Sequence, residues 1–527
     1  MTNPGPDTVQ LLADAGSVLQ PGFTGLTAPD WVRRRLGTGE LGGVALFGRN
    51  IADRAQVAAL TSEMYALNPD LLIATDEEGG DVTRLEVITG SSYPGNLALG
   101  AVDDISLTEN VARSIGVDLA AAGINLNYAP DADVNSNPDN PVIGVRSFGG
   151  DGELAARHTA AYVRGLQSAG VAACAKHFPG HGDTASDTHL GLPRIDLPLD
   201  VFGAHLAPFR AAVAAGAKSI MTAHILFPAY DTEMPATMSR AILTDLLRKD
   251  LGYDGLIVTD GIEMGAISGT HGIAEGTVKA IAGGADAICV GGGLQDEATF
   301  LYLRDALMWA VREGRLSEDR LHEAAERNRA VARWSASVRA QGAATVEPGI
   351  GLTAARRALR VQGELRPLRG VPHVVEFSPA ANFAVGDETA WGLSGPLADV
   401  IPGTTLTRVG APHSSRIETF GLLHTAVDNL DGAVDITPLL GAAVGRPLVI
   451  VVRDLHRYVW MKRAALELTA ARPDAVVVEV GTAYGLEETF AGRGVTVLTT
   501  FGGARVCGIA AAEALAGPAA ARTGRVA

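Results

Sequence analysis

The stretch VAACAKHF, residues 171–178, is one of a series of short apolar runs that decide the fold. Apolar residues fill these runs without alternating with polar ones, which is typical of parallel strands buried on both faces of a sheet. A weaker run, SVLQPGF at 17–23, brings the series to eight. The others are GGVALF (42–47), LLIATD (71–76), INLNYAPDAD (124–133), SIMTAHI (219–225), GLIVTDG (255–261) and ADAICVGG (285–292).

The segments between the runs have the periodicity of helices. Residues 153–170, ELAARHTAAYVRGLQSAG, and residues 201–216, VFGAHLAPFRAAVAAG, carry apolar side chains at helical spacing and end in glycine. About eight strand–helix units over about 340 residues predict an α/β fold of the TIM (β/α)8 barrel type. A doubly wound sheet built from the same units is the alternative.

A second, smaller domain is expected after the barrel. Beyond a long helical stretch at 317–338, the segment 342–351, GAATVEPGIG, loses its periodicity. We therefore predict a barrel over 1–340, a linker at 341–351 and an α/β sandwich over 352–527. The sandwich strands are expected at HVVEFS (373–378), PLVIVV (447–452), AVVVEV (475–480) and VTVLTT (495–500).

The composition argues against several classes of partner. The 43 Lys and Arg residues against 59 Asp and Glu residues give a net charge of −16, which repels nucleic acids and anionic membranes. The three cysteines, at 174, 289 and 507, lie far apart, which disfavours a disulfide framework and favours a reducing compartment. The first sixteen residues lack the pattern of a signal peptide, so we expect a cytoplasmic protein. No dinucleotide or Walker motif occurs, and no cofactor is expected.

Polar side chains end nearly every apolar run. Barrel active sites form at the carboxyl ends of the strands, so these residues are candidates for the site. His224, directly after one run, is expected to be a hydrogen-bonded histidine without a catalytic role. The residues at these ends are Asp76, Asp131, Asp133, Lys176, His177, His224 and Asp260.

The segment 176–193, KHFPGHGDTASDTHLGLP, holds the highest density of reactive side chains. Its glycines and proline predict a loop over a site. Asp187 and His189 are separated by one residue, so the carboxylate can orient the imidazole and raise its pKa, as a general acid requires. Asp260 in VTDG ends a strand and can serve as a nucleophile. A proton donor and an attacking carboxylate together make the double displacement of retaining glycosidases.

The same segment resembles the signature of family 3 glycoside hydrolases, in the β-N-acetylglucosaminidase branch typified by bacterial NagZ. Its pattern K-H-F-P-G-H-G-D-T-x-x-D-S-H is matched here except for Thr188 at the serine position, and MTAH (221–224) and PATMS (235–239) extend the resemblance over about residues 15–335. The resemblance implies a β-N-acetylhexosaminidase that acts on N-acetylglucosaminides in carbohydrate metabolism and cell wall recycling. It implies Asp260 as nucleophile, His189 as acid/base and Asp187 as its partner, with sugar hydroxyls bound by Asp76, Arg84, Arg146, Lys176 and His177.

Departures from the branch bear on how the substrate fits. Glu77 and Asp81 stand where the branch usually has Gln and Arg, and Gly261 stands where an acidic residue is common. Because a histidine acid is neutral after it gives up its proton, inorganic phosphate can replace water as the acceptor, so a phosphorylase is one alternative. A β-glucosidase of the same family is another.

A metal-dependent hydrolase and a sugar-binding protein without catalysis are two further alternatives. A metal-dependent barrel hydrolase would use zinc ligands from one loop, whereas barrel zinc sites draw on several strands, so no metal is expected. A sugar-binding protein without catalysis would require the loss of Asp187, His189 or Asp260, all of which are present. The residues that could ligate zinc are His177, His181, Asp183, Asp187 and His189.

Overall fold

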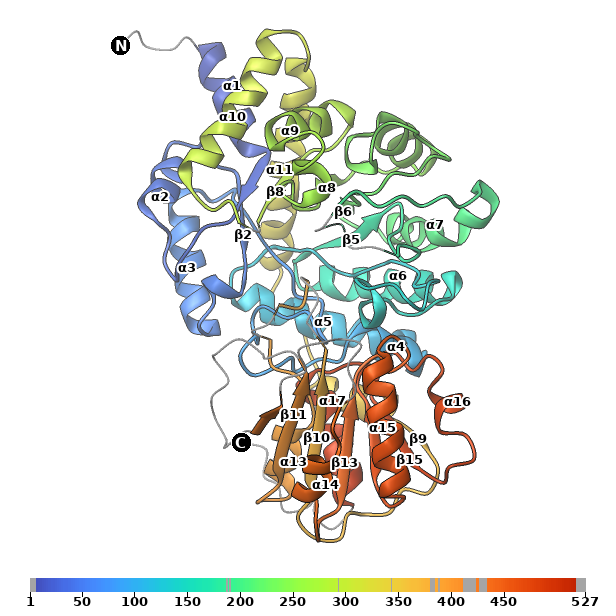
Figure 1. Cartoon of the computed structure of the whole chain (residues 1–527). Coiled ribbons are helices and arrows are strands. Elements are labelled where there is room, and N and C mark those ends of the chain that lie inside the picture. The colour runs from blue at the N-terminus through green and yellow to red at the C-terminus, as the bar shows by residue number, and fades with distance from the viewer. Residues whose placement is uncertain are drawn as a thin grey trace. The chain divides into compact units, whose positions relative to one another are not determined.

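The computed structural model divides into two compact units (Figure 1). The first unit comprises residues 1–78, 105–143 and 147–348, and the second comprises 79–104, 144–146 and 349–527. Because this division rests on compactness alone, the predicted boundaries at 1–340, 341–351 and 352–527 stay a prediction. The structure describes residues 6–185, 188, 191–291, 293–342, 344–379, 384–386, 389–410, 423–425 and 434–517.

Eight parallel strands form the barrel of the first unit. Six of them pair in chain order from β2 to β7, and β1 pairs with β8. A bridge between Val258 and Ala287 joins β7 to the strand that follows it. The predicted barrel is confirmed, and the weak run at 17–23 is a strand. The strands are β1 (Leu19–Pro21), β2 (Gly43–Leu46), β3 (Leu72–Thr75), β4 (Leu126–Asn127), β5 (Ala172–Phe178), β6 (Ser219–Thr222), β7 (Leu256–Thr259) and β8 (Ile288–Val290).

Helices follow the strands and surround the barrel (Figure 1). Acidic or hydroxyl side chains begin several of them: Asp151 accepts from Leu154 N, and Ser317 accepts from Arg320 N. The helices are α1 (Pro6–Ser17), α2 (Asp30–Gly37), α3 (Arg54–Leu67), α5 (Ile105–Ala121), α6 (Gly152–Ser168), α7 (Leu199–Ala214), the π-helix Ala241–Asp250, α8 (Gly265–Ser268), α9 (Ile273–Gly283), α10 (Glu297–Arg312) and α11 (Glu318–Arg339).

Alternate strand residues fill the barrel interior. Leu72 and Ala74 of β3 join Ala172 and Cys174 of β5 in one buried cluster, together with Leu256 and Val258 of β7. Because side chains of a strand alternate between its faces, the next residues in these three series also point inward. Those next residues are Asp76, Lys176 and Asp260.

The fourth strand is shorter than the apolar run that predicts it. Pro130 follows β4 and has no N–H to donate to a ladder, and the regular strand ends before it, at Asn127. The chain nevertheless stays beside β5, because Lys176 N donates to Pro130 O over 3.1 Å and Ala132 N donates to Lys176 O over 2.6 Å. Residues 131–133 therefore lie next to the end of β5.

The second unit is an α/β sandwich, as predicted. Its sheet has the order β12-β11-β10-β13-β14-β15-β9, parallel except for β9. Alternate residues of β13 serve two cores: Ile450 packs with Trp460 and Leu468 on one face, and Val449 packs with Leu397 on the other. The strands are β9 (Arg360–Gln362), β10 (His373–Ser378), β11 (Thr405–Gly410), β12 (Leu423–Thr425), β13 (Leu448–Val452), β14 (Val476–Glu479) and β15 (Thr496–Thr499).

Helices cover both faces of this sheet (Figure 1). Those with residues in the first core are α14 (Thr437–Ala442), α15 (Val459–Ala471) and α16 (Leu486–Phe490), and those in the second are α13 (Ser394–Val400) and α17 (Arg505–Ala516). The unit also contains α4 (Asn96–Val102), the 3-10 turn Gly144–Arg146 and α12 (Ile350–Ala358).

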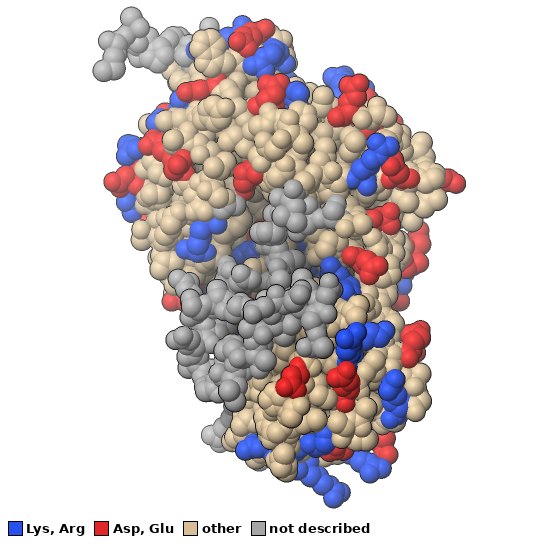
Figure 2. Space-filling model, in the orientation of Figure 1, with Lys and Arg blue, Asp and Glu red and all other residues tan. Residues whose placement is uncertain are grey.

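The described surface carries both signs of charge. On the face in Figure 2, acidic and basic side chains are interspersed over the helices of the barrel. None of the helices in the described part of the chain combines the length and the hydropathy needed to cross a membrane.

Candidate active site

Lys176 binds two carboxylates at the carboxyl end of the barrel. Its Nζ lies 2.6 Å from Asp76 Oδ1 and 2.7 Å from Glu78 Oε1, and its side chain is only 3% exposed. Pairing with two anions offsets the cost of burying the ammonium group. Asp76 and Lys176 were both predicted, and the structure brings them together. Glu78 was not predicted, although it lies in the same ATDEEGG segment.

Asp260 faces the same interior. Its Oδ1 accepts a hydrogen bond of 2.7 Å from Gly261 N, directly after β7. Burial raises the pKa of the Cys174 thiol to about 12, Lys176 lowers it, and Asp76 and Asp260 both add to the rise. Cys174 belongs to the buried interior cluster and lies two residues before Lys176 in β5.

His224 supports the turn that carries Asp260. The ring is fully buried, with Nε2 2.8 Å from Gly261 O and Nδ1 2.7 Å from Thr237 Oγ1. Both ring nitrogens are engaged, as expected for a hydrogen-bonded histidine. The imidazole therefore holds the backbone next to the proposed nucleophile.

Asp133 organises the start of the loop after β5. Its Oδ2 accepts from His177 Nδ1 over 2.8 Å, and its Oδ1 accepts from His181 N over 2.6 Å. Asp131 Oδ1 in turn accepts from Asp133 N over 3.0 Å. This carboxylate fixes the orientation of the predicted sugar-binding residue His177. Asp133 ends the run INLNYAPDAD, which was the available signal for this role.

His181 is a neutral anchor inside the loop. Burial first, and the neighbouring His177 second, lower its pKa to about 4. Its Nδ1 lies 2.9 Å from Thr184 Oγ1 and its Nε2 3.5 Å from Thr188 Oγ1. Thr188 O also accepts from Ala266 N over 3.2 Å. Asp187 and His189, the predicted acid/base pair on either side of Thr188, lie outside the described residues.

One group of side chains has the geometry to hold a metal ion. Donor atoms of Asp131, Asp133 and His177 lie within 4.8 Å of one another. Asp133 already accepts the hydrogen bonds described above, which occupy its carboxylate. Among the expected zinc ligands that the structure describes, His177 belongs to this group and His181 and Asp183 do not. His181 Nδ1 lies 2.9 Å from Thr184 Oγ1, and Asp183 Oδ1 accepts from Ser136 Oγ.

The two predicted arginines belong to the second unit. Arg84 Nη2 donates to Ala384 O over 2.8 Å. Arg146 ends the 3-10 turn Gly144–Arg146, where it is buried and its carbonyl accepts from Asn96 Nδ2 over 2.7 Å. The four other site candidates that the structure describes, Asp76, Lys176, His177 and Asp260, belong to the first unit.

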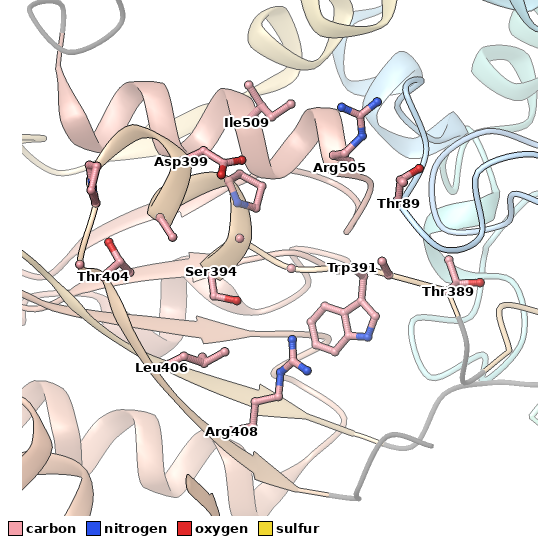
Figure 3. A pocket seen from close by; sticks show the side chains of 17 residues that line it. Thr89, Thr389, Trp391, Ser394, Asp399, Thr404, Leu406, Arg408, Arg505 and Ile509 are labelled. Carbon is pink, nitrogen blue, oxygen red and sulfur yellow. The ribbon is translucent and has the colours of Figure 1, made fainter. Parts of the chain in front are cut away.

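The second unit also contains a cavity of about 760 Å³ (Figure 3). None of the predicted site residues is among the residues that line it. Its wall is largely apolar, with charged side chains on different sides. Lining residues labelled in Figure 3 include Trp391, Asp399, Arg408 and Arg505.

Comparisons with known proteins identify the family. The glycosyl hydrolase family 3 N terminal domain matches residues 19–331, which is more than half of the chain. The chain belongs to glycosyl hydrolase family 3. The resemblance found in the sequence is thereby confirmed, and the matched residues span the barrel strands of the family fold.

Relatives in this family carry related names. The chain is 39% identical over 283 residues to β-hexosaminidase A of Pseudoalteromonas piscicida, covering 49% of this chain and 47% of that protein. It is 38% identical over 268 residues to β-hexosaminidase of Neisseria meningitidis serogroup C, covering 49% of this chain and 73% of that protein. The chain thus spans about half the length of the Pseudoalteromonas relative.

Solved structures extend the likeness beyond the barrel. A family 3 β-N-acetylglucosaminidase from Paenibacillus sp. str. FPU-7 has 34% identity and a TM-score of 0.81, with 96% of each chain covered. NagZ from Neisseria gonorrhoeae has 31% identity and a TM-score of 0.53, covering 65% of this chain and 97% of that one.

Proposed function

We propose that the chain is a retaining β-N-acetylhexosaminidase that removes terminal N-acetylglucosamine. One observation carries the proposal: Asp76 directly after β3, Lys176 in β5 and Asp260 directly after β7 continue the inward-facing series of these strands, at the end of the barrel where such folds bind substrates. The names of the family relatives at 39% and 34% identity support the choice of sugar.

In the first step Asp260 attacks the anomeric carbon and forms a glycosyl ester, while the bond to the leaving oxygen breaks. His189, oriented by Asp187, gives its proton to that oxygen. In the second step His189 takes a proton from water, whose oxygen attacks the same carbon and releases Asp260. Two inversions give net retention. The Gly261 N–H bond to Oδ1 orients the attacking carboxylate.

Sugar hydroxyls are bound by charged groups that the fold holds in place. Lys176 offers ammonium protons to hydroxyl oxygens, and Asp76 accepts from hydroxyl groups. His177 is oriented for the same task by Asp133. Arg84 and Arg146 complete the proposed set, as the family resemblance implies.

The test of this function is turnover of nitrophenyl N-acetylglucosaminide and nitrophenyl glucoside by the purified chain. We expect the N-acetylglucosaminide to have a kcat/KM at least about tenfold higher, because a site that binds the acetamido group discriminates against its absence. A higher kcat/KM for the glucoside would identify a β-glucosidase instead.

Phosphate is a second acceptor for the same glycosyl enzyme. The D-T-H sequence at 187–189 provides a histidine acid, which is neutral after proton transfer and repels an incoming anion less than a carboxylate does. Phosphate oxygen then attacks the anomeric carbon in place of water. Formation of N-acetylglucosamine 1-phosphate with millimolar phosphate present is the expected product of this route. If an active preparation forms none, the route is excluded.

A metal-dependent mechanism makes the opposite prediction on chelation. We expect full turnover after exhaustive dialysis against a chelator, since the proposed steps use only side chains of this chain. Loss of activity that added zinc restores would favour the metal-dependent hydrolase.

We further propose that the enzyme works in the cytoplasm, in the recycling of cell wall fragments. The three cysteines are free thiols, each buried, which suits a reducing compartment. Fractionation of the native host followed by detection of the chain tests the location.

A further inference from the structure

A tight turn at Gly79 and Gly80 begins the part of the second unit that contains Asp81, and it directs the Asp81 side chain toward the ends of the second sheet's strands. Gly79 and Gly80 both have left-handed backbone conformations, with φ of 78° and 68°. A Cβ at Gly80 would lie 2.5 Å from Gly95 Cα, so the turn has no room for a side chain there. Directly after the turn, the Asp81 side chain is only 1% exposed.

Asp81 is held by groups from two strand ends of the second sheet. Its Oδ2 lies 2.5 Å from Arg453 Nη2, directly after β13, and its Oδ1 accepts from Gly503 N over 2.8 Å, beyond β15. The Arg453 guanidinium also lies 5.5 Å from the centre of the Trp391 ring. A Cβ at Gly503 would lie 3.3 to 3.5 Å from Trp391, Arg453 and Asp81, so glycine leaves room for this contact.

The position of this ion pair in the sheet is informative. From β10 the chain continues to β11 on one side, and β13 pairs with the other side of β10. Open α/β sheets bind their ligands at the carboxyl ends of strands beside such a reversal. Here Arg453, directly after β13, forms an ion pair with Asp81 of the same chain. A position where such sheets bind ligands therefore anchors the loop that begins at Asp81.

The loop that Asp81 anchors carries Arg84, three residues further on. Its far end is tied to α17, because Arg505 Nη2 donates to Ser92 Oγ over 2.6 Å and Arg505 Nε donates to Gly90 O over 3.3 Å. Arg84 therefore lies between the Asp81–Arg453 ion pair and the contacts of Arg505 on α17, and Arg453 is the more buried of these two arginines.

We propose that Arg453 is a positioning residue for substrate binding: through its ion pair with Asp81 it holds Arg84 at the place where Arg84 contacts the sugar. The inference rests on the proposed function, which assigns Arg84 to a sugar hydroxyl. Asp81, Arg84 and Arg453 all belong to the second unit, where the sandwich supplies the group that fixes this loop.

The pair is suited to this role by its burial. Loss of either charge leaves the other uncompensated in a site closed to water, which drives the loop to rearrange. Displacement of a binding group by about 1 Å can lower kcat/KM by up to about a hundredfold, and where the lost contact is a binding one the loss falls on KM. Loss of the Asp81–Arg453 pair should therefore raise KM far more than loss of an exposed ion pair would.

The experiment compares Asp81→Asn, Arg84→Ala and the double variant on nitrophenyl N-acetylglucosaminide. We expect Asp81→Asn to raise KM at least about tenfold and to change kcat less than about threefold. Because Asp81 acts through Arg84, the double variant should be no worse than Arg84→Ala alone. Losses in kcat/KM that multiply in the double variant would overturn the proposal.

Glu376→Gln is the matched control. Glu376 Oε1 lies 2.9 Å from Arg408 Nε, in another buried ion pair of the same sheet that does not include residues 79–104. We expect this variant to keep the wild-type KM. An equal rise in KM would mean that any damage to the sheet has the same effect, and the specific role of Asp81 would be lost.

Trypsin gives a readout that is independent of turnover. Arg84 is the only Lys or Arg in 79–104, so cleavage inside this segment can occur only after Arg84. We expect Asp81→Asn to be cut there at least about tenfold faster than wild type, because cleavage reports the opening of the loop. Wild-type KM together with wild-type protection would overturn the proposal.

Two further results separate the possible failures. If Asp81→Asn is not obtained folded, Arg453→Lys keeps the positive charge without the planar guanidinium, and a smaller rise in KM is expected; an unchanged KM there counts against the proposal. If the unaltered chain does not cleave the N-acetylglucosaminide, the proposed function has failed, while the rate of cutting after Arg84 still tests the ion pair.

Discussion

Asp260 is the residue whose replacement should remove activity without harming the fold. We expect Asp260→Asn to lower kcat at least about a thousandfold, because an amide does not form the glycosyl ester. The melting temperature should change by less than about 3 °C, since the side chain is half-buried at a strand end. The measurements are kcat on nitrophenyl N-acetylglucosaminide and calorimetric melting. Asp254→Asn, exposed at the opposite end of β7, is the control and should retain full activity.

The need for His189 as an acid should be greatest for substrates with poor leaving groups. For His189→Ala we expect a loss of less than about tenfold in kcat/KM, which reports the first step, on a substrate with a dinitrophenolate leaving group, because this group departs without a proton. On an N-acetylglucosamine disaccharide the loss should exceed about a hundredfold. The two rates are measured side by side. Equal losses on both substrates would contradict the acid role.

His181 should make the fold sensitive to acid. Its pKa of about 4 in the folded chain is below the ordinary value of 6.5, so the unfolded chain binds the proton more readily. The free energy of unfolding should therefore fall by up to about 3 kcal/mol as the pH drops from about 6.5 to about 4, and this contribution is absent above pH 6.5. Urea unfolding across this range should show a shallower decline for His181→Asn. Parallel curves for the two proteins would contradict this assignment.

At the scale of the elements, β3 and β5 are linked by one buried cation. We expect Lys176→Met to lower the free energy of unfolding by about 3 kcal/mol or more, because Asp76 and Glu78 then lack their shared partner. Adding Glu78→Gln should restore part of that stability. Lys249→Met is the control, since its ion pair with Asp245 is exposed and should contribute less than about 1 kcal/mol. Urea unfolding measures all three variants, and equal losses would count against the buried triad.

The apolar strands were predictable from their sequence, and the polar ones were not. A run such as LVIVV in β13 has few alternatives to a buried strand. In contrast, β11 reads TLTRVG and β9 is exposed along its length, so neither carries the apolar signal. The same holds for the candidate site. The ends of apolar runs predicted Asp76, Lys176 and Asp260, whereas no signal in the sequence indicated contacts between segments far apart in the chain.

At the scale of the whole molecule, the main feature hidden from the sequence is the path of the chain between the units. Residues 79–104 and 144–146 leave the barrel series and group with the sandwich. The composition of these segments does not predict this grouping. Residues 79–104 are held to the sandwich by an ion pair between Asp81 and Arg453, which are 372 positions apart in the sequence.

The central claim is that Asp260 becomes covalently bonded to the sugar during turnover. A fluorinated N-acetylglucosaminide slows the second step, so the glycosyl enzyme accumulates and can be digested and mapped by mass spectrometry. The account predicts one added sugar on the peptide that contains Asp260, and none in Asp260→Asn. A label on any other side chain, or turnover without a trapped intermediate, would contradict it.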